Sequence, residues 1–225
     1  CHGAHQNLPK VFEVCRDIVK CMKKFSSPLK ESQLEEVIKV LRNDGTIVYP
    51  TDTLYGLGVN PFKKEAVKKM FEIKKRPLDQ PVSIAVYDIS QIEEYVELTD
   101  LARHTTKEFL PGPLTILLKK RYPASLPIVS SKNRIGVRIL DHPVALPILE
   151  RFGPITSTSA NLHDYELPCD VDTAIEQLGD SVDIYIDSGR CRYGQESTVL
   201  DVSSDSPKII RPGVISHERL RINEK

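Results

Sequence analysis

Gly45-Thr-Ile-Val-Tyr-Pro-Thr-Asp-Thr-Leu-Tyr-Gly-Leu-Gly-Val-Asn60 is the most informative stretch of this chain. Its β-branched run, residues 47–49, predicts a short strand that ends at Pro50, because proline cannot donate to a sheet ladder. The hydroxyl and glycine residues that follow would bring free N–H and O–H groups to a sheet edge, where open α/β folds bind small ligands. Taken alone, Gly56-x-Gly58 fits an ordinary loop better, so the interpretation depends on later segments.

Length and composition indicate one globular domain of ordinary character. The chain has 225 residues, enough for one sizeable core, with 31 basic and 31 acidic residues. Overall charge therefore favours no class of charged partner, and only a local basic patch could attract an anion. No apolar run approaches the roughly 18 residues of a membrane span, and no leader sequence is expected.

Cysteine usage predicts a reducing, cytoplasmic environment. The cysteines are odd in number, and no CxxC pair occurs among them. The segment Cys1-His2-x-x-His5 has metal-like spacing, but we expect no metal site formed by protein side chains. The five cysteines are Cys1, Cys15, Cys21, Cys169 and Cys191.

Hydrophobic periodicity predicts alternating helices and strands. We expect an amphipathic helix over 10–25 and an N-terminal helical extension over 1–27, followed by one domain over 28–225. Further helices are expected at 31–43, 63–75, 89–96, 99–109, 143–152, 171–178 and 216–222. Strands are expected at 47–49, 82–87, 114–118, 135–139, 155–157, 182–186, 198–202 and 208–210. Several late strands leave no room for helical crossovers, so the α/β fold should contain a twisted mixed sheet with flanking helices.

Basic residues occur where predicted elements end. Lys74 and Arg76 close a helix, where they could simply cap it or could bind phosphate or carboxylate oxygens. Arg138 lies in an otherwise apolar strand and needs an anionic partner, which could equally be an internal carboxylate or a ligand. Arg211 follows the last strand and adds a third cation.

Hydroxyl residues gather at the same places. Residues 156–159 hold four consecutive hydroxyl side chains before Asn161, more than one helix cap needs. No P-loop, close carboxylate pair or Ser-His-Asp arrangement accompanies them. The pattern therefore indicates positioning and charge stabilisation of an anionic, phosphate-bearing substrate.

Seven motifs in order resemble the YrdC family of threonylcarbamoyl-AMP synthases. They are Pro50-Thr-Asp-Thr-Leu-Tyr-Gly-Leu-Gly58, Lys74-x-Arg76, Pro111-Gly-Pro-Leu-Thr115, Gly136-Val-Arg138, Ser159-Ala-Asn161, Glu196-Ser-Thr-Val199 and Arg211-Pro-Gly213. The resemblance runs from about residue 31 to about 220. It implies a YrdC-like fold with an open concave cavity. It also implies a nucleotidyltransferase that makes L-threonylcarbamoyladenylate from L-threonine, bicarbonate and ATP, releasing pyrophosphate, for N6-threonylcarbamoyladenosine in tRNAs that read codons starting with A.

The resemblance also implies a division of the site. Catalysis would rest on Lys74 and Arg76, and ATP would arrive with Mg²⁺. The implied partner is tRNA or the transferase complex that acts downstream. ATP-binding residues would be Lys74, Arg76, Thr115, Ser159, Asn161 and Arg211. Threonine-binding residues would be Thr51, Thr53, Arg138, Ser157 and Ser197.

Two departures from the family pattern and two other functions stay open. Ala85 stands where many long members have histidine, and Leu162-His163-Asp164 replaces a common Leu-Ser-Gly. The chain resembles the short form that lacks a C-terminal domain. One alternative is a tRNA- or double-stranded-RNA-binding module without catalysis. The other is the carbamoyl-transfer domain of hydrogenase maturation proteins.

Overall fold

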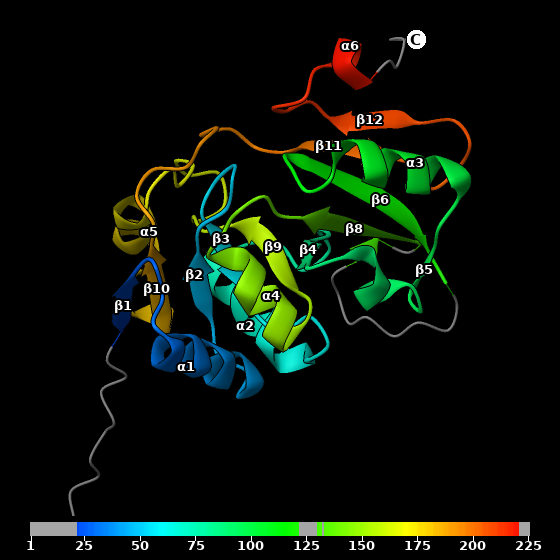
Figure 1. Cartoon of the computed structure of the whole chain (residues 1–225). Helices are drawn as coiled ribbons and strands as arrows, with labels where there is room; N and C mark the ends of the chain where they lie inside the picture. The colour runs from blue at the N-terminus through cyan, green and yellow to red at the C-terminus, as the bar shows by residue number, and fades with distance from the viewer. Residues whose placement is uncertain (1–21, 122–129, 132, 221–225) are drawn as a thin grey trace, which may run out of the picture.

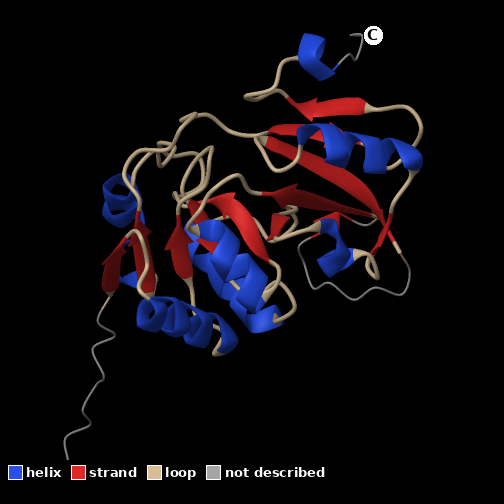
Figure 2. Ribbon diagram, in the orientation of Figure 1, coloured by secondary structure: helices blue, strands red, loops and turns tan. Residues whose placement is uncertain are grey.

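A single mixed sheet forms the centre of the protein, as Figures 1 and 2 show. The computed structural model describes residues 22–121, 130–131 and 133–220. In the described part, twelve strands follow the order β1-β10-β2-β3-β9-β4-β8-β6-β11-β12, with β5 beside β6 and β7 beside β8. Parallel and antiparallel pairs both occur, for example β4 with β8 and β6 with β8. The predicted twisted mixed sheet is therefore confirmed.

The strands and helices have the following bounds in the described residues. Strands are β1 Lys23–Ser26, β2 Ile47–Tyr49, β3 Gly56–Gly58, β4 Ser83–Val86, β5 Val96–Glu97, β6 Leu114–Lys120, β7 Ser130–Ser131, β8 Arg134–Ile139, β9 Ile155–Ser159, β10 Ile184–Asp187, β11 Thr198–Asp201 and β12 Lys208–Arg211. Helices are α1 Glu31–Arg42, α2 Lys64–Lys74, α3 Asp100–Phe109, α4 Ala145–Phe152, α5 Val171–Leu178 and α6 His217–Leu220, with short 3₁₀ turns at Ile89–Ile92 and Gly179–Ser181.

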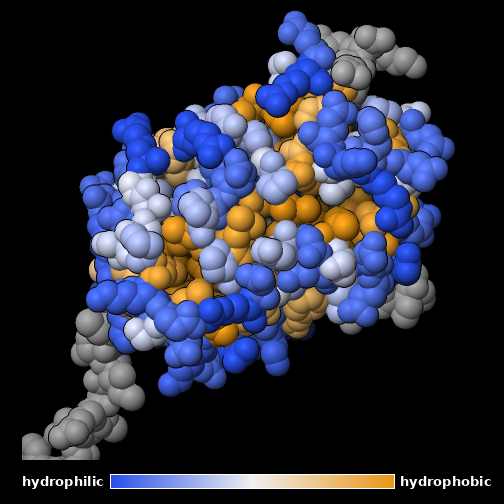
Figure 3. Space-filling view, viewed as in Figure 1, coloured by the Kyte–Doolittle hydropathy of each residue, from blue (hydrophilic) through white to orange (hydrophobic). Residues whose placement is uncertain are grey.

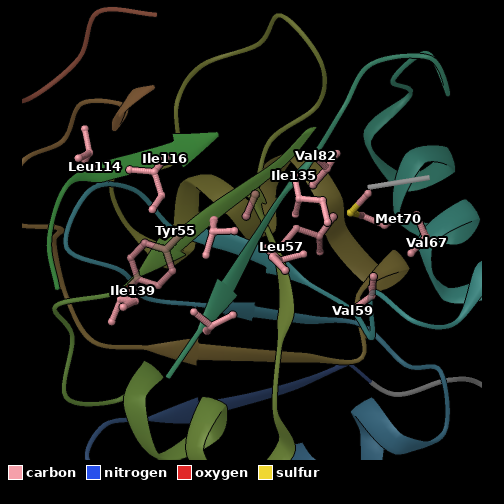
Figure 4. Close-up of a cluster of buried hydrophobic side chains, with 14 of the residues drawn as sticks. Tyr55, Leu57, Val59, Val67, Met70, Val82, Leu114, Ile116, Ile135 and Ile139 are labelled. Carbon is pink, nitrogen blue, oxygen red and sulfur yellow. The ribbon is translucent and has the colours of Figure 1, made fainter. Parts of the chain in front are cut away.

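Two apolar clusters lie on opposite faces of the sheet, because successive side chains of a strand point to opposite faces. In β2, Val48 joins the larger cluster, whereas Ile47 and Tyr49 join the smaller one with α1 and α4. The larger cluster takes apolar residues from α2, α3 and α5. Figure 4 shows its centre, where Val67 and Met70 of α2 lie near Val82, which precedes β4, and Ile135 of β8.

The smaller cluster leaves part of its face of the sheet uncovered. Along β6 and β8, Ile116 and Val137 join the larger cluster, while Leu117, Gly136 and Arg138 point to the other side and line a cavity. Helices α1 and α4 lie together in Figure 1, and their apolar cluster includes β2 and β10 residues. The open part of the sheet face is therefore the floor of a concavity.

The predicted helix over 10–25 is wrong where the structure describes it. Lys23–Ser26 is strand β1, which pairs in parallel with β10 from Lys23 opposite Ile184 to Ser26 opposite Asp187. Backbone pairing with a neighbouring strand overrides local helical periodicity. The sheet thus begins before residue 28, and residues 1–21, including Cys1, His2 and His5, lie outside the described residues.

The predicted helix over 89–96 is also wrong. Asp88 accepts a hydrogen bond from the Ser90 amide at 2.8 Å, and only the short turn Ile89–Ile92 follows. Val96 then pairs with Lys120 as part of β5. A long strand offers a backbone partner at this point, so the chain extends. The predicted helix at 216–222 appears as α6, described over His217–Leu220, and its last two predicted residues lie outside the described residues.

Gly56 and Gly58 form strand β3 rather than a loop. Strand β3 lies between β2 and β9, with Tyr49 opposite Gly56. A Cβ atom added at Gly56 would lie 2.9 Å from the Tyr49 ring, and one at Gly58 would lie equally close. The two glycines therefore make room for a fully buried tyrosine, whose hydroxyl donates to the Thr156 carbonyl at 3.0 Å.

Charged and apolar residues divide the visible surface. Figure 3 shows hydrophilic residues along the margins and apolar residues in the middle of the face. Within the described ranges, none of the helices combines the length and the hydrophobicity that a membrane crossing requires.

Candidate functional site

A cavity of about 440 Å³ opens on the uncovered part of the sheet. This volume lies in the range of small-molecule sites. Its walls come from chain segments far apart in sequence, from Thr51 to Arg211. The predicted site residues that line it are Thr51, Thr53, Arg76, Thr115, Arg138, Ser157, Ser159, Ser197 and Arg211.

Arg138 lines the cavity, and three groups hold its side chain. Its Nη2 donates to Asp52 Oδ1 at 2.6 Å, its Nη1 donates to Thr53 Oγ1 at 2.6 Å, and its Nε donates to the Gly112 carbonyl at 3.3 Å. Its side chain is 5% exposed and that of Asp52 is 0% exposed. The internal partner that the sequence left open is therefore Asp52. A guanidinium has five donors, so two remain after these three bonds.

Several hydroxyl groups line the cavity together with Arg138. Thr51 Oγ1 accepts from the Thr53 and Leu54 amides at 3.1 and 3.2 Å, a local turn that fixes the segment after β2. Thr115 Oγ1 and Ser197 Oγ lie 2.8 Å apart and link β6 to the start of β11. Arg138 and these hydroxyls can therefore recognise a small carboxylate that carries further polar groups.

Arg76 and Arg211 are two further cations of the cavity lining, and Arg211 lies close enough to Arg138 for their charges to interact. Arg211 donates to Glu196 Oε1 at 2.6 Å and to the Ser197 carbonyl at 2.9 Å, and Arg76 donates to the Pro81 carbonyl at 3.2 Å. The Nε atoms of both arginines are buried and have no partner among the described residues. Burial, together with the charge of Arg211, lowers the pKa of Arg76. Two nearby guanidinium groups with unused donors can bind a polyanion.

Lys74 does not line the cavity, contrary to the expectation of direct phosphate contact. It is 1% exposed, and its Nζ donates to the carbonyls of Ser159 and Asn161, the second at 2.7 Å. Burial, followed by the positive charge of Arg76, lowers the pKa of Lys74 to about 7. In this structure Lys74 holds the backbone of the Ser159-Ala-Asn161 segment. It lies behind the cavity wall that Ser159 helps to form, and from there its positive charge can act on an anion in the cavity.

Asn161 also lies behind the cavity wall. Its Oδ1 accepts from Ser159 Oγ at 2.5 Å and from Lys74 Nζ at 3.3 Å, and its Nδ2 donates to the Tyr165 carbonyl at 3.0 Å. These bonds use both acceptor sites of Oδ1 and one of the two Nδ2 donors, and they position Ser159, which does line the cavity.

The end of α2 explains where Arg76 points. Lys75 has φ 51°, the left-handed conformation that commonly ends helices, and the Arg76 amide donates to the Phe71 carbonyl at 3.0 Å. The chain therefore reverses immediately, before Pro77. This local turn carries Arg76 to the cavity.

Sequence reasoning missed several cavity residues. Glu196 was quoted in a motif but given no role, and Ser83, Arg134 and Gly136 were not assigned to the site. Asp52 was also given no role; it bonds Arg138 without lining the cavity. Period-two alternation could have found some of them: Gly136 lies two residues before Arg138, and Ser83 lies two before Ala85, which pairs with Arg138.

The two departures from the family pattern have structural explanations. Ala85 is 0% exposed and belongs to the apolar cluster with Tyr49 and Ile155, and it does not line the cavity. Asp164 has φ 62°, a conformation that glycine adopts freely and that aspartate tolerates better than most residues. The loop after Asn161 thus keeps its turn without glycine.

Gly213 permits the close approach of two strands that carry site residues. A Cβ atom there would lie 2.4 Å from the Glu196 carbonyl oxygen and 2.5 Å from the Thr198 nitrogen, both backbone atoms. Gly213→Ala should therefore lower the free energy of unfolding by about 1–3 kcal/mol, measured by urea denaturation. Exposed Pro212→Ala is the control and should change it little; equal stability of both variants would contradict the steric argument.

Across residues 22–121, 130–131 and 133–220, no group of three or more His, Cys, Asp or Glu side chains is placed to hold a metal ion. The arrangement defines a small-molecule site on a mixed α/β sheet, in which guanidinium groups and hydroxyls can bind a polyanion and a carboxylate. The family model Sua5/YciO/YrdC, described as "Telomere recombination", matches residues 39–213. The chain belongs to this family.

Relatives and solved structures agree with this membership. A putative threonylcarbamoyl-AMP synthase of Methanocaldococcus jannaschii is 38% identical over 85% of this chain and 93% of its own length. The Bacillus subtilis threonylcarbamoyl-AMP synthase is 34% identical over 84% of this chain, which spans 56% of that protein. Crystalline P. abyssi Sua5 complexed with L-threonine is 31% identical, with a TM-score of 0.83 over 89% of this chain and 60% of its own.

Proposed function

We propose that this protein is a threonylcarbamoyl-AMP synthase that joins L-threonine, bicarbonate and ATP into L-threonylcarbamoyladenylate and releases pyrophosphate. The observation that carries the proposal is one cavity whose lining includes the guanidinium groups of Arg76, Arg138 and Arg211 together with many hydroxyl groups. The names of the relatives and the threonine complex of P. abyssi Sua5 support it.

The cavity offers binding groups for threonine and for the phosphates of ATP. The two spare donors of Arg138 would take the threonine carboxylate, and the surrounding Thr51, Thr53, Ser157 and Ser197 would orient its polar groups. The threonine amine and bicarbonate form a carbamate with loss of water. A carbamate oxygen then attacks the α-phosphorus of ATP, and the bond to pyrophosphate breaks. Arg76 and Arg211 would offset the charge that otherwise keeps the two anions apart.

Magnesium would enter with ATP. Glu196 is the one carboxylate among the described lining residues, and it is already paired with Arg211. Mg²⁺ is commonly held by one or two carboxylates together with phosphate oxygens, so this donor set fits an ion bound mainly through the nucleotide. When bound, the ion would offset phosphate charge.

The product would serve tRNA modification. L-threonylcarbamoyladenylate is a reactive mixed anhydride, so a transferase acting on tRNA adenosine must consume it. We include direct binding of tRNA or of that transferase complex, and a cytoplasmic location, in the proposal. The RNA-binding alternative predicts strongly salt-dependent association that needs no ATP.

The deciding experiment measures pyrophosphate release with ATP, Mg²⁺, labelled bicarbonate and one amino acid at a time. We expect release that requires threonine and bicarbonate together, and a new labelled adenylate on chromatography. Serine, which lacks the methyl group, and valine, which lacks the hydroxyl, are the matched comparisons. If pyrophosphate is not formed with any of them, the proposal is wrong.

The pKa of Lys74 predicts a pH dependence of nucleotide binding. Because this pKa is lowered to about 7, Lys74 carries its charge below pH 7 and loses it as the pH rises. The ratio of ATP affinities, wild type over Lys74→Met, should therefore fall about three- to tenfold between pH 6 and pH 8. Using the ratio removes the titration of ATP itself. Calorimetric titration provides the affinities, and a ratio independent of pH would contradict the assignment.

A further inference from the structure

Asp52 lies behind the cavity and touches it only through Arg138. Its neighbours Thr51 and Thr53 line the cavity, but Asp52 does not. Its carboxylate is fully buried, its Oδ1 accepts from Arg138 Nη2 at 2.6 Å, and its Oδ2 has no partner among the described residues. Burial removes the water that would solvate this carboxylate, and the hydrogen bond from Arg138 replaces that solvation only in part.

A buried ion pair of this kind is weak evidence for a role in stability. The desolvation of two charges offsets most of their attraction, and apolar residues of similar volume often serve a fold equally well. The pair does fix direction, however, because Asp52, Thr53 and the Gly112 carbonyl hold three different nitrogens of one planar group. The long Arg138 side chain, which could adopt many rotamers, is thereby held in one orientation.

The backbone around Asp52 is itself fixed. The Asp52 carbonyl accepts from the Tyr193 amide at 3.1 Å, and the Thr53 carbonyl accepts from the Gly194 amide at 3.1 Å. Thr51 Oγ1 fixes the same turn from the other side. The carboxylate therefore stands on a segment that has little freedom to move away from Arg138.

We propose that Asp52 is a positioning residue for amino-acid recognition: it orients Arg138 so that the two unused guanidinium donors face the substrate carboxylate. This inference rests on the proposed function and adds a residue to it.

The test uses L-threoninamide, which keeps the threonine side chain but has no carboxylate. Calorimetry measures the affinities of wild type and Asp52→Asn for both compounds, with ATP affinity recorded in parallel. Asparagine keeps one acceptor and the volume but removes the charge. We expect the preference for threonine over threoninamide to fall about tenfold in Asp52→Asn, while ATP affinity changes less than about threefold.

Asp183→Asn is the matched control. Asp183 accepts from the Thr46 amide at 2.8 Å and from Thr46 Oγ1 at 2.9 Å, at the opposite end of β2 from Asp52, and it does not line the cavity. This substitution should lower thermal stability and leave the ligand preference unchanged. An unchanged preference in Asp52→Asn, or an equal loss for both compounds and ATP, would show a merely structural role and overturn the inference.

The proposed function fails in a different way. If the wild type binds threonine with a clear preference over threoninamide but forms no adenylate, the proposed function is wrong and the calorimetric comparison still decides the role of Asp52. If the wild type shows no preference for threonine, the inference about Asp52 is overturned as well.

Discussion

Arg76→Ala is expected to reduce threonine-dependent pyrophosphate release by at least about 100-fold, because it removes a directed cationic donor from the place where charge develops. Arg76 lines the cavity, and its guanidinium has donors beyond the one that bonds the Pro81 carbonyl, so a phosphate oxygen can be bound. Among the described residues, its one hydrogen bond, to the Pro81 carbonyl at 3.2 Å, lies within a surface loop. The fold should therefore survive the substitution.

The matched control is Lys75→Gln. This substitution removes the same unit of charge from the neighbouring residue, but Lys75 is exposed and does not line the cavity. Steady-state kinetics should show nearly full activity for Lys75→Gln, and circular dichroism should show unchanged folding for both variants. Comparable activity in the two variants would remove Arg76 from the catalytic machinery.

Arg138→Leu is expected to lower the free energy of unfolding by about 3–5 kcal/mol, because it leaves the buried carboxylate of Asp52 without its charge partner. The side chain of Asp52 is 0% exposed, so water cannot replace the lost bonds. Urea denaturation measures the change. Binding of threonine should be lost at the same time.

The double variant Arg138→Leu with Asp52→Leu separates the two effects. Removing both charges should restore much of the stability, since apolar pairs often replace buried ion pairs without loss, yet threonine binding should stay absent. If the double variant is as unstable as the single one, the cost lies in packing rather than in the unpaired carboxylate. Restored threonine binding would argue against the role of Arg138.

The sequence predicted the mixed sheet well, because apolar runs such as residues 47–49 and 135–139 are buried in the interior of the sheet. It failed where tertiary pairing decided the local structure. Lys23–Ser26 became a strand because β10 offers it a parallel partner, and Gly56–Gly58 became a strand because Tyr49 needs the space above two glycines. Neither partner lies within the sequence window that periodicity samples.

The sequence predicted that the motif residues come together, but it did not distinguish the residues that line the cavity from those that lie behind its wall. Motif residues such as Arg76, Arg138 and Arg211 meet at one cavity. Lys74 and Asn161 were expected to contact a nucleotide, but in the structure both are buried behind the residues that line the cavity. Residue type and order along the chain cannot distinguish a group that faces a ligand from one that holds the facing group, because both need the same chemistry.

The order of the cavity walls along the chain has a consequence for synthesis on the ribosome. Strands β11 and β12 leave the ribosome after the other described strands, and Ser197, just before β11, and Arg211, the last residue of β12, both line the cavity. A nascent chain that ends before residue 196 could pair most of its sheet but would lack half of the guanidinium pair. The proposed nucleotide site would therefore be complete only after residue 211 is made, and free ATP would not assist the folding of the elements that precede β11.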